Sequence, residues 1–330
     1  MRKLSLLLCL GFSVVVPTVS QAQDANQPSA QAAPAPAASP AELKAGPQAG
    51  QKVAFLGDSI TQYGWSNQTG YVHLVVMEME KQGRKIEAIP AGVSGNTSKD
   101  MLMRLDRDVL SKKPDWMTLS CGVNDVWHGA TGVPLDDYKK NITAIVDKAT
   151  AAGIRVVILT STLIMEDPTN DNNQKLVAYN DFLHSLAAER GLPVAELNSD
   201  EQAELTKMIA DSPDIKGPRL TVDGVHMNGM GNEIMAAGIL KAFGSTDAQI
   251  ADAKAAWVDL PGAMATVPKG GLSVTQYLHL QALAQSQGKT VDELVNEPWK
   301  KDLDTFQNTP VPPHAPGAPA TSTNAAPASP

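Results

Sequence analysis

The sequence predicts a three-layer α/β/α sandwich built on a five-stranded parallel sheet, followed by a C-terminal helical extension. Short apolar runs alternate along the chain with longer stretches that have helical apolar spacing. The run RVVILT at 155–160 is almost entirely β-branched or apolar, as in a strand that helices cover on both faces. Because strands separated by helices of this length form βαβ units, we expect a parallel sheet with ligands at the carboxyl ends of its strands.

The first half of the predicted domain alternates between strands and helices. VAFLG at 53–57 is an apolar run that ends in glycine, and IEAI at 86–89 is the next apolar run. Apolar residues at helical spacing predict a helix between them, over 71–82, and a second helix over 97–110. WMTLS at 116–120 is the third predicted strand.

The second half repeats this order with clearer stop signals. An amphipathic helix is expected over 135–152, where Gly153 ends it, and another over 172–190, where Gly191 ends it. The remaining predicted elements are the strand PVAEL at 193–197 and a final helix over 232–243.

The first 22 residues have the pattern of a secretory signal peptide. Arg2 and Lys3 precede the apolar run LSLLLCLGFSVVV, and small residues stand at a cleavage site that ends with Ala22. Lipoprotein anchoring is the alternative, but it requires a small residue before Cys9, where Leu8 stands. We therefore expect an exported protein, either periplasmic or extracellular.

Composition divides the remaining chain. An Ala/Pro-rich linker at 23–50 and a Pro/Ala-rich tail at 305–330 are expected to be disordered, because they cannot bury enough apolar surface. The main domain is expected at 51–244, and the helical extension at 245–304 carries no chemical motif.

Charge and cysteine content exclude several classes of protein. The formal net charge is −8, whereas nucleic-acid binding requires clustered Lys and Arg. No stretch of the main domain is apolar for long enough to insert stably into a membrane. After cleavage Cys121 is the single cysteine, so no internal disulfide is expected, and its apolar surroundings favour a small buried residue over a reactive thiol.

Polar motifs follow the predicted strands at the edge where ligands are expected. GDSITQYG places Ser59 at a helix start, where its hydroxyl is exposed and its backbone N–H is free. AGVSGNTS contains Gly92 and Gly95, which allow a close approach of the backbone to a ligand. CGVNDVW contributes Asn124 to the same crevice.

A fourth motif, VDGVHMNGMG, places Asp223 and His226 just before the last helix. Each motif alone is equally consistent with turn or loop chemistry. Together the four supply a nucleophile, backbone donors, an amide donor and an Asp–His pair, which is the set of groups that acyl transfer requires.

These motifs resemble those of the SGNH (GDSL) hydrolase superfamily, with G-D-S-I-T, G-V-S-G-N-T, G-V-N-D and D-G-V-H spread over residues 51–244. The resemblance implies a flavodoxin-like sheet and a serine esterase with Ser59 as nucleophile, His226 as base and Asp223 as its orienting carboxylate. It also implies an oxyanion hole formed by the backbone N–H groups of Ser59 and Gly95 and the side chain of Asn124. Pro90 stands where family members often have Asn, which predicts altered loop bracing.

Several residues beside the motifs are candidates for the substrate cleft. Asp58, Asp125, Trp127 and His128 are adjacent to the motif residues, but a loop-packing role is equally consistent with their positions. Tyr63 and Trp65 have the same two interpretations.

The expected substrate is a small-molecule or polysaccharide ester, most of all an O-acetyl group on a carbohydrate, because the superfamily includes such enzymes. A lysophospholipase or short-chain lipase is the first alternative, and a glycan-binding module without activity is the second. The sequence lacks the spacings typical of zinc ligands, phosphate loops and dinucleotide binding, so we expect neither a metal nor a cofactor.

Overall fold

The computed structural model describes residues 39–215, 217–260, 265–267, 270–291 and 294. The predicted signal peptide at 1–22, the tail at 305–330 and the first part of the predicted linker lie outside these residues.

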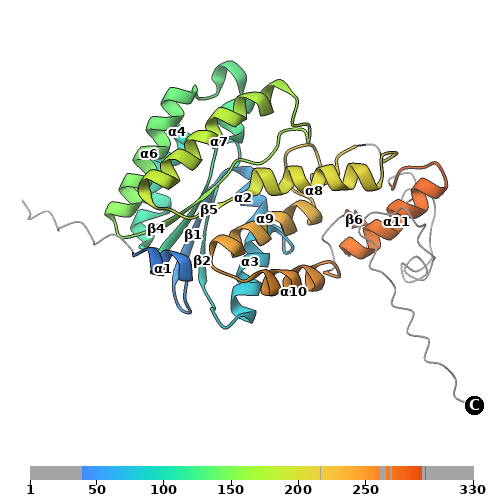
Figure 1. The fold of residues 1–330 in the computed structure, drawn as a ribbon, viewed down its shortest axis with the longest axis horizontal. Helices are drawn as coiled ribbons and strands as arrows, with labels where there is room; N and C mark the ends of the chain where they lie inside the picture. Colours follow the sequence, from blue (N-terminus) through green and yellow to red (C-terminus); the bar gives the residue numbers. More distant parts are fainter. Residues whose placement is uncertain (1–38, 216, 261–264, 268–269, 292–293, 295–330) are drawn as a thin grey trace, which may run out of the picture. The chain divides into compact units, whose positions relative to one another are not determined.

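A five-stranded sheet forms the centre of the fold, and all of its neighbouring strands are parallel, as predicted (Figure 1). The spatial order is β2-β1-β3-β4-β5. The strands are β1 (Lys52–Gly57), β2 (Glu87–Gly92), β3 (Trp116–Ser120), β4 (Arg155–Leu159) and β5 (Val194–Ala195).

Helices cover both faces of this sheet (Figure 1). One layer contains α4 (Ser98–Asp108), α6 (Leu135–Ala151) and α7 (Asp171–Arg190). The other layer contains α2 (Ser59–Ser66), α3 (Tyr71–Lys81), α8 (Leu197–Asp211) and α9 (Gly229–Ala242). The shorter elements are α1 (Pro40–Ala45), α5 (Val123–Trp127) and the 3-10 turns η1 (Leu110–Lys112) and η2 (Gly129–Thr131).

The central strands are buried on both faces, which explains their continuous apolar sequence. Every residue of β3 is buried, and β1 is buried from Val53 to Gly57. β2 lies at the edge of the sheet, which is where a sheet tolerates a residue without a backbone N–H such as Pro90. The predicted three-layer architecture is therefore confirmed.

The structure departs from the sequence predictions in three described segments. Residues 40–45 of the predicted disordered linker form α1, where Ser39 and Glu42 make a reciprocal capping box. The predicted strand 193–197 is reduced to two residues because Leu197 already begins α8. The extension at 245–304, expected to be helical, also contains a hairpin of β6 (Ala265–Val267) and β7 (Gly270–Leu272).

Among its described residues, the extension includes the helices α10 (Asp247–Trp257) and α11 (Val274–Ser286). Trp257 at the end of α10 is fully buried and belongs to the main hydrophobic core. α11 packs through Val274 and Leu278 against Met230 and Val258. α10 thus shares the main core, whereas α11 belongs to a separate, smaller hydrophobic cluster.

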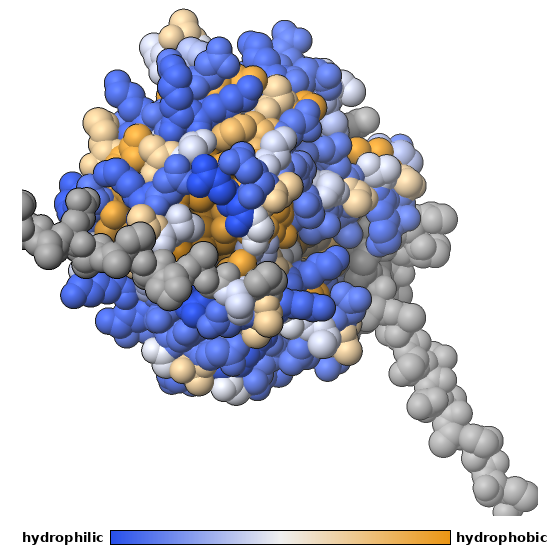
Figure 2. Space-filling view, turned by 60° about the vertical axis from the view of Figure 1, so that its left-hand side comes forward, coloured by the Kyte–Doolittle hydropathy of each residue, from blue (hydrophilic) through white to orange (hydrophobic). Residues whose placement is uncertain are grey.

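The surface is largely hydrophilic on the face that Figure 2 shows, with hydrophobic side chains between the polar ones. Among the described residues, no helix combines the length and the apolar character that crossing a bilayer demands.

The strand order reverses between β1 and β3, since β1 is followed along the chain by β2 on one side and then by β3 on the other. Such a reversal opens a crevice at the carboxyl ends of the two strands. Ser59 follows β1, Gly95 follows β2 and Asn124 follows β3, so three of the four motifs meet at this crevice.

Candidate active site

Ser59 is the first residue of α2, directly after the buried strand β1. The carboxylate of Asp58 caps this helix by accepting a hydrogen bond of 2.9 Å from the backbone N–H of Ile60. The backbone N–H of Ser59 donates to no described residue. The helix start therefore presents both a hydroxyl and an unused N–H group toward the crevice.

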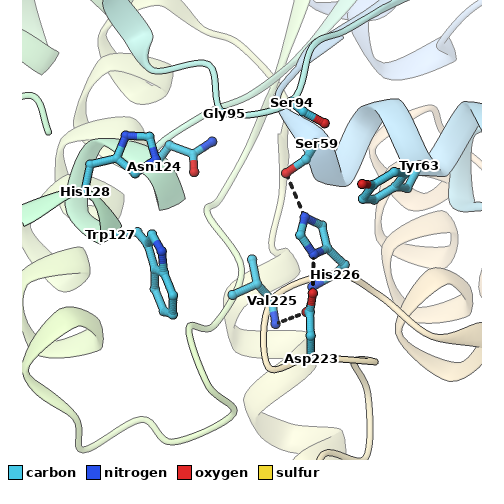
Figure 3. A pocket seen from close by; sticks show the side chains of 10 residues that line it. All are labelled: Ser59, Tyr63, Ser94, Gly95, Asn124, Trp127, His128, Asp223, Val225 and His226. Atoms are coloured by element: carbon cyan, nitrogen blue, oxygen red, sulfur yellow. Dashed lines mark hydrogen bonds and ion pairs between the residues drawn. The ribbon is translucent and has the colours of Figure 1, made fainter. Parts of the chain in front are cut away.

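The imidazole of His226 joins Ser59 to Asp223 (Figure 3). Its Nε2 is 2.9 Å from the Oγ of Ser59, and its Nδ1 is 2.6 Å from a carboxylate oxygen of Asp223. Because a carboxylate only accepts, Nδ1 carries the proton and Nε2 accepts the hydrogen bond from the serine hydroxyl. This is the tautomer in which an imidazole can take a proton from serine.

Asp223 is held by its own loop. One of its carboxylate oxygens accepts hydrogen bonds from the backbone N–H groups of Val225, at 3.0 Å, and His226, at 2.8 Å. Partial burial raises the pKa of Asp223, but the hydrogen bonds from the His226 ring and from these two N–H groups outweigh it and lower the pKa. The carboxylate therefore stays ionised opposite the imidazole.

Three groups can donate a hydrogen bond to an oxygen next to Ser59. The first is the N–H of Ser59 itself, and the second is the N–H of Gly95, which also donates to no described residue. The third is the side chain of Asn124, one N–H of which binds the carbonyl of Asn96 at 3.0 Å. This bond fixes the amide and leaves its second N–H for the crevice.

The two predicted glycines differ in their roles. Gly95 has a φ of +74°, a left-handed conformation that side chains with a Cβ disfavour, and it lines the pocket. A Cβ on Gly92 instead would lie 2.3 Å from the backbone nitrogen of Gln62 in α2. The expectation that Gly92 serves a close approach to ligand is therefore wrong: this glycine lets β2 pack against α2.

A pocket of about 340 Å³ contains these groups. Residues of all four motifs line this pocket, and they include the large aromatic side chains of Tyr63 and Trp127. The full lining is Ser59, Tyr63, Ser94, Gly95, Asn124, Trp127, His128, Asp223, Val225 and His226. In Figure 3, Trp127 and His128 lie across the pocket from His226, while Tyr63 lies beside the imidazole. The rings of Tyr63 and His226 meet edge to face, 4.9 Å apart.

The cleft candidates divide accordingly. Trp127, His128 and Tyr63 line the pocket, whereas Trp65 stacks on His73 at 4.6 Å. The expectation that Asp58 and Asp125 lie in the cleft is wrong, because both side chains are only 2% exposed and neither lines the pocket.

These two buried aspartates stabilise the segments that carry the residues of the pocket. Asp125 accepts hydrogen bonds from the backbone N–H and hydroxyl of Ser98, and thus ties α5 to α4. Burial raises the pKa of Asp58 to about 6, and burial likewise raises the pKa of Asp125 despite the bonds from Ser98. Cys121 is buried as expected, and its thiol donates to Asp125 at 3.4 Å.

Arg104 is a brace that the sequence analysis missed. Its buried guanidinium donates to the carbonyls of Gly57, at 2.7 Å, and Ala91, at 2.8 Å, where β1 and β2 end. It also donates to the side-chain oxygen of Asn96 at 2.6 Å, and the backbone carbonyl of Asn96 in turn accepts the hydrogen bond that orients Asn124. A charged residue on the inward face of α4, three positions after the buried Met101, is the sequence signal that could have revealed it.

Within the described residues, His, Cys, Asp and Glu side chains form no cluster of three or more that could hold a metal ion. The groups that converge in the pocket are a hydroxyl, an imidazole and N–H donors, and these suit acyl transfer without a metal.

Comparison with known proteins agrees with this chemistry. The family model of the GDSL-like lipase/acylhydrolase family matches residues 55–234. The acetylxylan esterase of Geobacillus stearothermophilus is 27% identical over 214 residues, which cover 59% of this chain and 94% of that protein. Esterase TesA of Pseudomonas aeruginosa is 28% identical over 142 residues, which cover 43% of this chain and 67% of that protein.

A solved structure shows the same relationship. The crystal structure of the acetyl xylan esterase AlAXEase matches with a TM-score of 0.54 and 35% identity, covering 58% of this chain and 98% of that one.

Proposed function

This chain belongs to the GDSL-like lipase/acylhydrolase family and is a carboxylic ester hydrolase, and we propose that it removes O-acetyl groups from carbohydrates outside the cytoplasm. The observation that carries the proposal is the continuous hydrogen-bonded series Ser59–His226–Asp223 at the edge of a pocket with unused N–H donors.

The proposed first step is attack by Ser59. The hydroxyl is a poor nucleophile until the neutral imidazole of His226 takes its proton, and such proton transfer contributes roughly 10²–10⁴-fold to the rate. Oγ bonds to the acyl carbon, the carbonyl oxygen becomes an oxyanion, and Asp223 stabilises the imidazolium. The N–H groups of Ser59 and Gly95 and the amide of Asn124 then donate to the oxyanion, each worth on the order of 10²–10³-fold.

The intermediate collapses when the imidazolium gives its proton to the leaving alcohol. The acyl group remains on Ser59 as an ester. A water molecule, deprotonated by the same imidazole, attacks this ester and releases the carboxylic acid, which restores the serine hydroxyl. The two half-reactions use the same donors, so one pocket serves both.

Several features support a carbohydrate ester. The relatives include two acetylxylan esterases by name. The pocket presents Trp127 and Tyr63, which are 39% and 49% exposed, so that broad aromatic surfaces are free to pack against a sugar ring. A lysophospholipase or short-chain lipase is the second candidate, favoured by the description of the family as lipases and acylhydrolases.

The deciding experiment is a substrate screen of the purified protein. Acetate release from acetylated xylo-oligosaccharides is compared with hydrolysis of p-nitrophenyl esters of increasing acyl length, with Ser59→Ala as the blank. We expect high kcat/KM on the acetylated sugars and a steep fall beyond short acyl chains. Higher rates on long acyl chains, with none on acetylated sugars, would favour the lipase alternative.

Export is the second part of the proposal, and it depends on the signal-peptide pattern at 1–22. N-terminal sequencing of the protein recovered from a secreting host is expected to begin at Gln23. A mature protein that begins at Met1 would contradict this part while leaving the chemistry untouched.

A further inference from the structure

The loop that carries Asp223 and His226 is exposed, and burial does little to hold it. Val222 is 64% exposed, and the side chain of Asp223 is 50% exposed. The loop has a single isolated bridge, between Thr221 and Met227, and otherwise lacks regular structure. Since proton transfer requires the imidazole to stay within hydrogen-bond reach of Ser59, a contact from outside the loop would add to its own hydrogen bonds, such as that from Val222 to His226, in fixing its position.

Glu166, in the segment after β4, supplies this restraint. Its Oε2 accepts a hydrogen bond of 2.6 Å from the N–H of Arg219. Its Oε1 accepts from the N–H groups of Leu220, at 2.9 Å, and Thr221, at 2.7 Å, and from the hydroxyl of Thr221. One carboxylate therefore binds three consecutive backbone N–H groups at the point where the chain enters the loop.

The contacts continue to the residue after Asp223. The hydroxyl of Thr221, which donates to Glu166, accepts a hydrogen bond of 3.0 Å from the N–H of Gly224. The carbonyl of Gly224 accepts a hydrogen bond of 2.6 Å from the N–H of Met165. Glu166 thus restrains the loop at residues 219–221, and Met165 restrains it at Gly224.

The backbone conformation at Met165 and Glu166 is itself unusual. Three of the described non-glycine residues have a positive φ, and two of them are Met165, at 60°, and Glu166, at 50°. Side chains with a Cβ rarely adopt this conformation, and such residues concentrate at functional sites, where the surrounding contacts hold them in place. Here the conformation directs the Glu166 carboxylate at the three N–H groups.

We propose that Glu166 is a positioning residue that holds the Asp223–His226 loop in register with Ser59. The proposal rests on the proposed roles of Asp223 and His226. The residues that donate hydrogen bonds to the carboxylate of Glu166 are not among those that line the pocket. Its contribution is to prevent the imidazole from drifting away from the serine hydroxyl.

Glu166→Gln is the primary test. The carboxylate only accepts, whereas the amide has an NH₂ group that must face an N–H donor of the loop. Since a misplacement of about 1 Å can cost on the order of 10²-fold in rate, we expect kcat on p-nitrophenyl acetate to fall 10- to 100-fold with KM nearly unchanged. Asp167→Asn is the matched control and should leave kcat unchanged, because among the described residues the carboxylate of Asp167 accepts hydrogen bonds from Thr169 alone.

A spectroscopic readout separates positioning from general destabilisation. The ¹⁵N NMR shift of Nε2 of His226 reports its hydrogen bond with the hydroxyl of Ser59, and this signal should be the same in the wild type and in Asp167→Asn but change in Glu166→Gln. Ile145→Val truncates a buried residue of α6 that does not line the pocket, so it is expected to lower the melting temperature while keeping the signal and kcat.

Thr221→Val provides a second variant that keeps the backbone contacts of Glu166 and removes only the hydroxyl bridge to Gly224. We expect a smaller fall in kcat, about 3- to 10-fold, with the same change in the NMR signal. Wild-type kcat in both variants, or a loss that Ile145→Val reproduces at an equal melting temperature, overturns the proposal. Inactivity of the wild-type protein toward every ester would instead refute the proposed function.

Discussion

Nε2 of His226 lies 2.9 Å from Oγ of Ser59, although 167 positions of the chain separate the two residues. Ser59 is placed by the end of β1, and His226 by a loop that precedes α9, so the pair exists only in the folded domain. This contact makes Ser59 the first residue to test.

Ser59→Ala is expected to lower kcat/KM on p-nitrophenyl acetate by roughly 10⁴-fold or more, because the group that forms the acyl bond is lost. The melting temperature should stay within a few degrees, since Asp58 still caps α2 and alanine favours a helix. Ser94→Ala is the control, because it removes a second hydroxyl from the same pocket. Substantial turnover by Ser59→Ala would exclude it as the nucleophile.

Asn124→Ala is expected to lower kcat by about 10²–10³-fold with little change in KM, because its amide acts mainly on the oxyanion of the transition state. Steady-state kinetics on an acetyl ester measures both constants. His128→Ala removes the side chain of another residue that lines the pocket, at the C-terminal end of α5, and is expected to leave kcat within a few-fold of the wild-type value. An effect of Asn124→Ala on KM alone would contradict the assignment.

Arg104→Met is expected to reduce both stability and activity. The methionine keeps the apolar stem but removes the guanidinium donor to the carbonyl of Ala91 and one of two donors to the carbonyl of Gly57, which also accepts from the N–H of Val93. This loss costs about 2–4 kcal/mol in the free energy of unfolding. Urea unfolding measures the loss, and kcat should fall as well, since Asn96 no longer has its partner. Arg107→Met on the exposed side of α4 is the control, and it should leave the free energy of unfolding nearly unchanged.

Glu201→Gln is expected to change how stability depends on pH. Burial raises the pKa of Glu201 from 4.5 to about 8, against a hydrogen bond from the N–H of Leu163 that lowers it. The folded protein therefore holds a proton that the unfolded chain releases, so the stabilisation is complete below pH 4.5 and is lost as the pH rises to 8.

Removing the titrating group should reduce the decrease in the free energy of unfolding between pH 5 and pH 8.5 by an amount on the order of a few kcal/mol. Urea unfolding of both proteins at pH 5 and pH 8.5 measures it, with Glu204→Gln on the exposed side of α8 as the control. Glu233, whose pKa burial also raises to about 8, contributes a fall of the same sign that remains in the variant. Parallel pH dependences for the wild type and Glu201→Gln would show that Glu201 ionises freely in the fold.

The sheet was predictable because its strands are buried on both faces and therefore have nearly unbroken apolar sequences, as in β3 at 116–120. The helix α8 was not, because its sequence is mostly polar and its inward face includes the carboxyl of Glu201. The hairpin β6–β7 is three residues per strand, too short for a periodic signal. Burial of a charged group and very short elements depend on tertiary contacts that local sequence does not reveal.

The candidate site shows the same division. The motifs predicted that Ser59, Asn124 and His226 share one crevice, and all three line one pocket, while their catalytic roles remain predictions. The inward orientation of Asp58 and Asp125 and the brace by Glu166 were not predictable from the motifs. Those relationships join segments that are distant in the chain, such as Glu166 and Arg219, and no local spacing records them.

The partial exposure of Asp223 and His226 has a consequence for the size of the alcohol that can leave. The acid–base end of the pocket is open to solvent, with half of the Asp223 side chain and a quarter of the His226 side chain uncovered. For the proposed carbohydrate ester, the leaving alcohol would stand at this open end of the pocket. The proposal therefore includes acetyl groups along a polymer as well as those on a free monosaccharide.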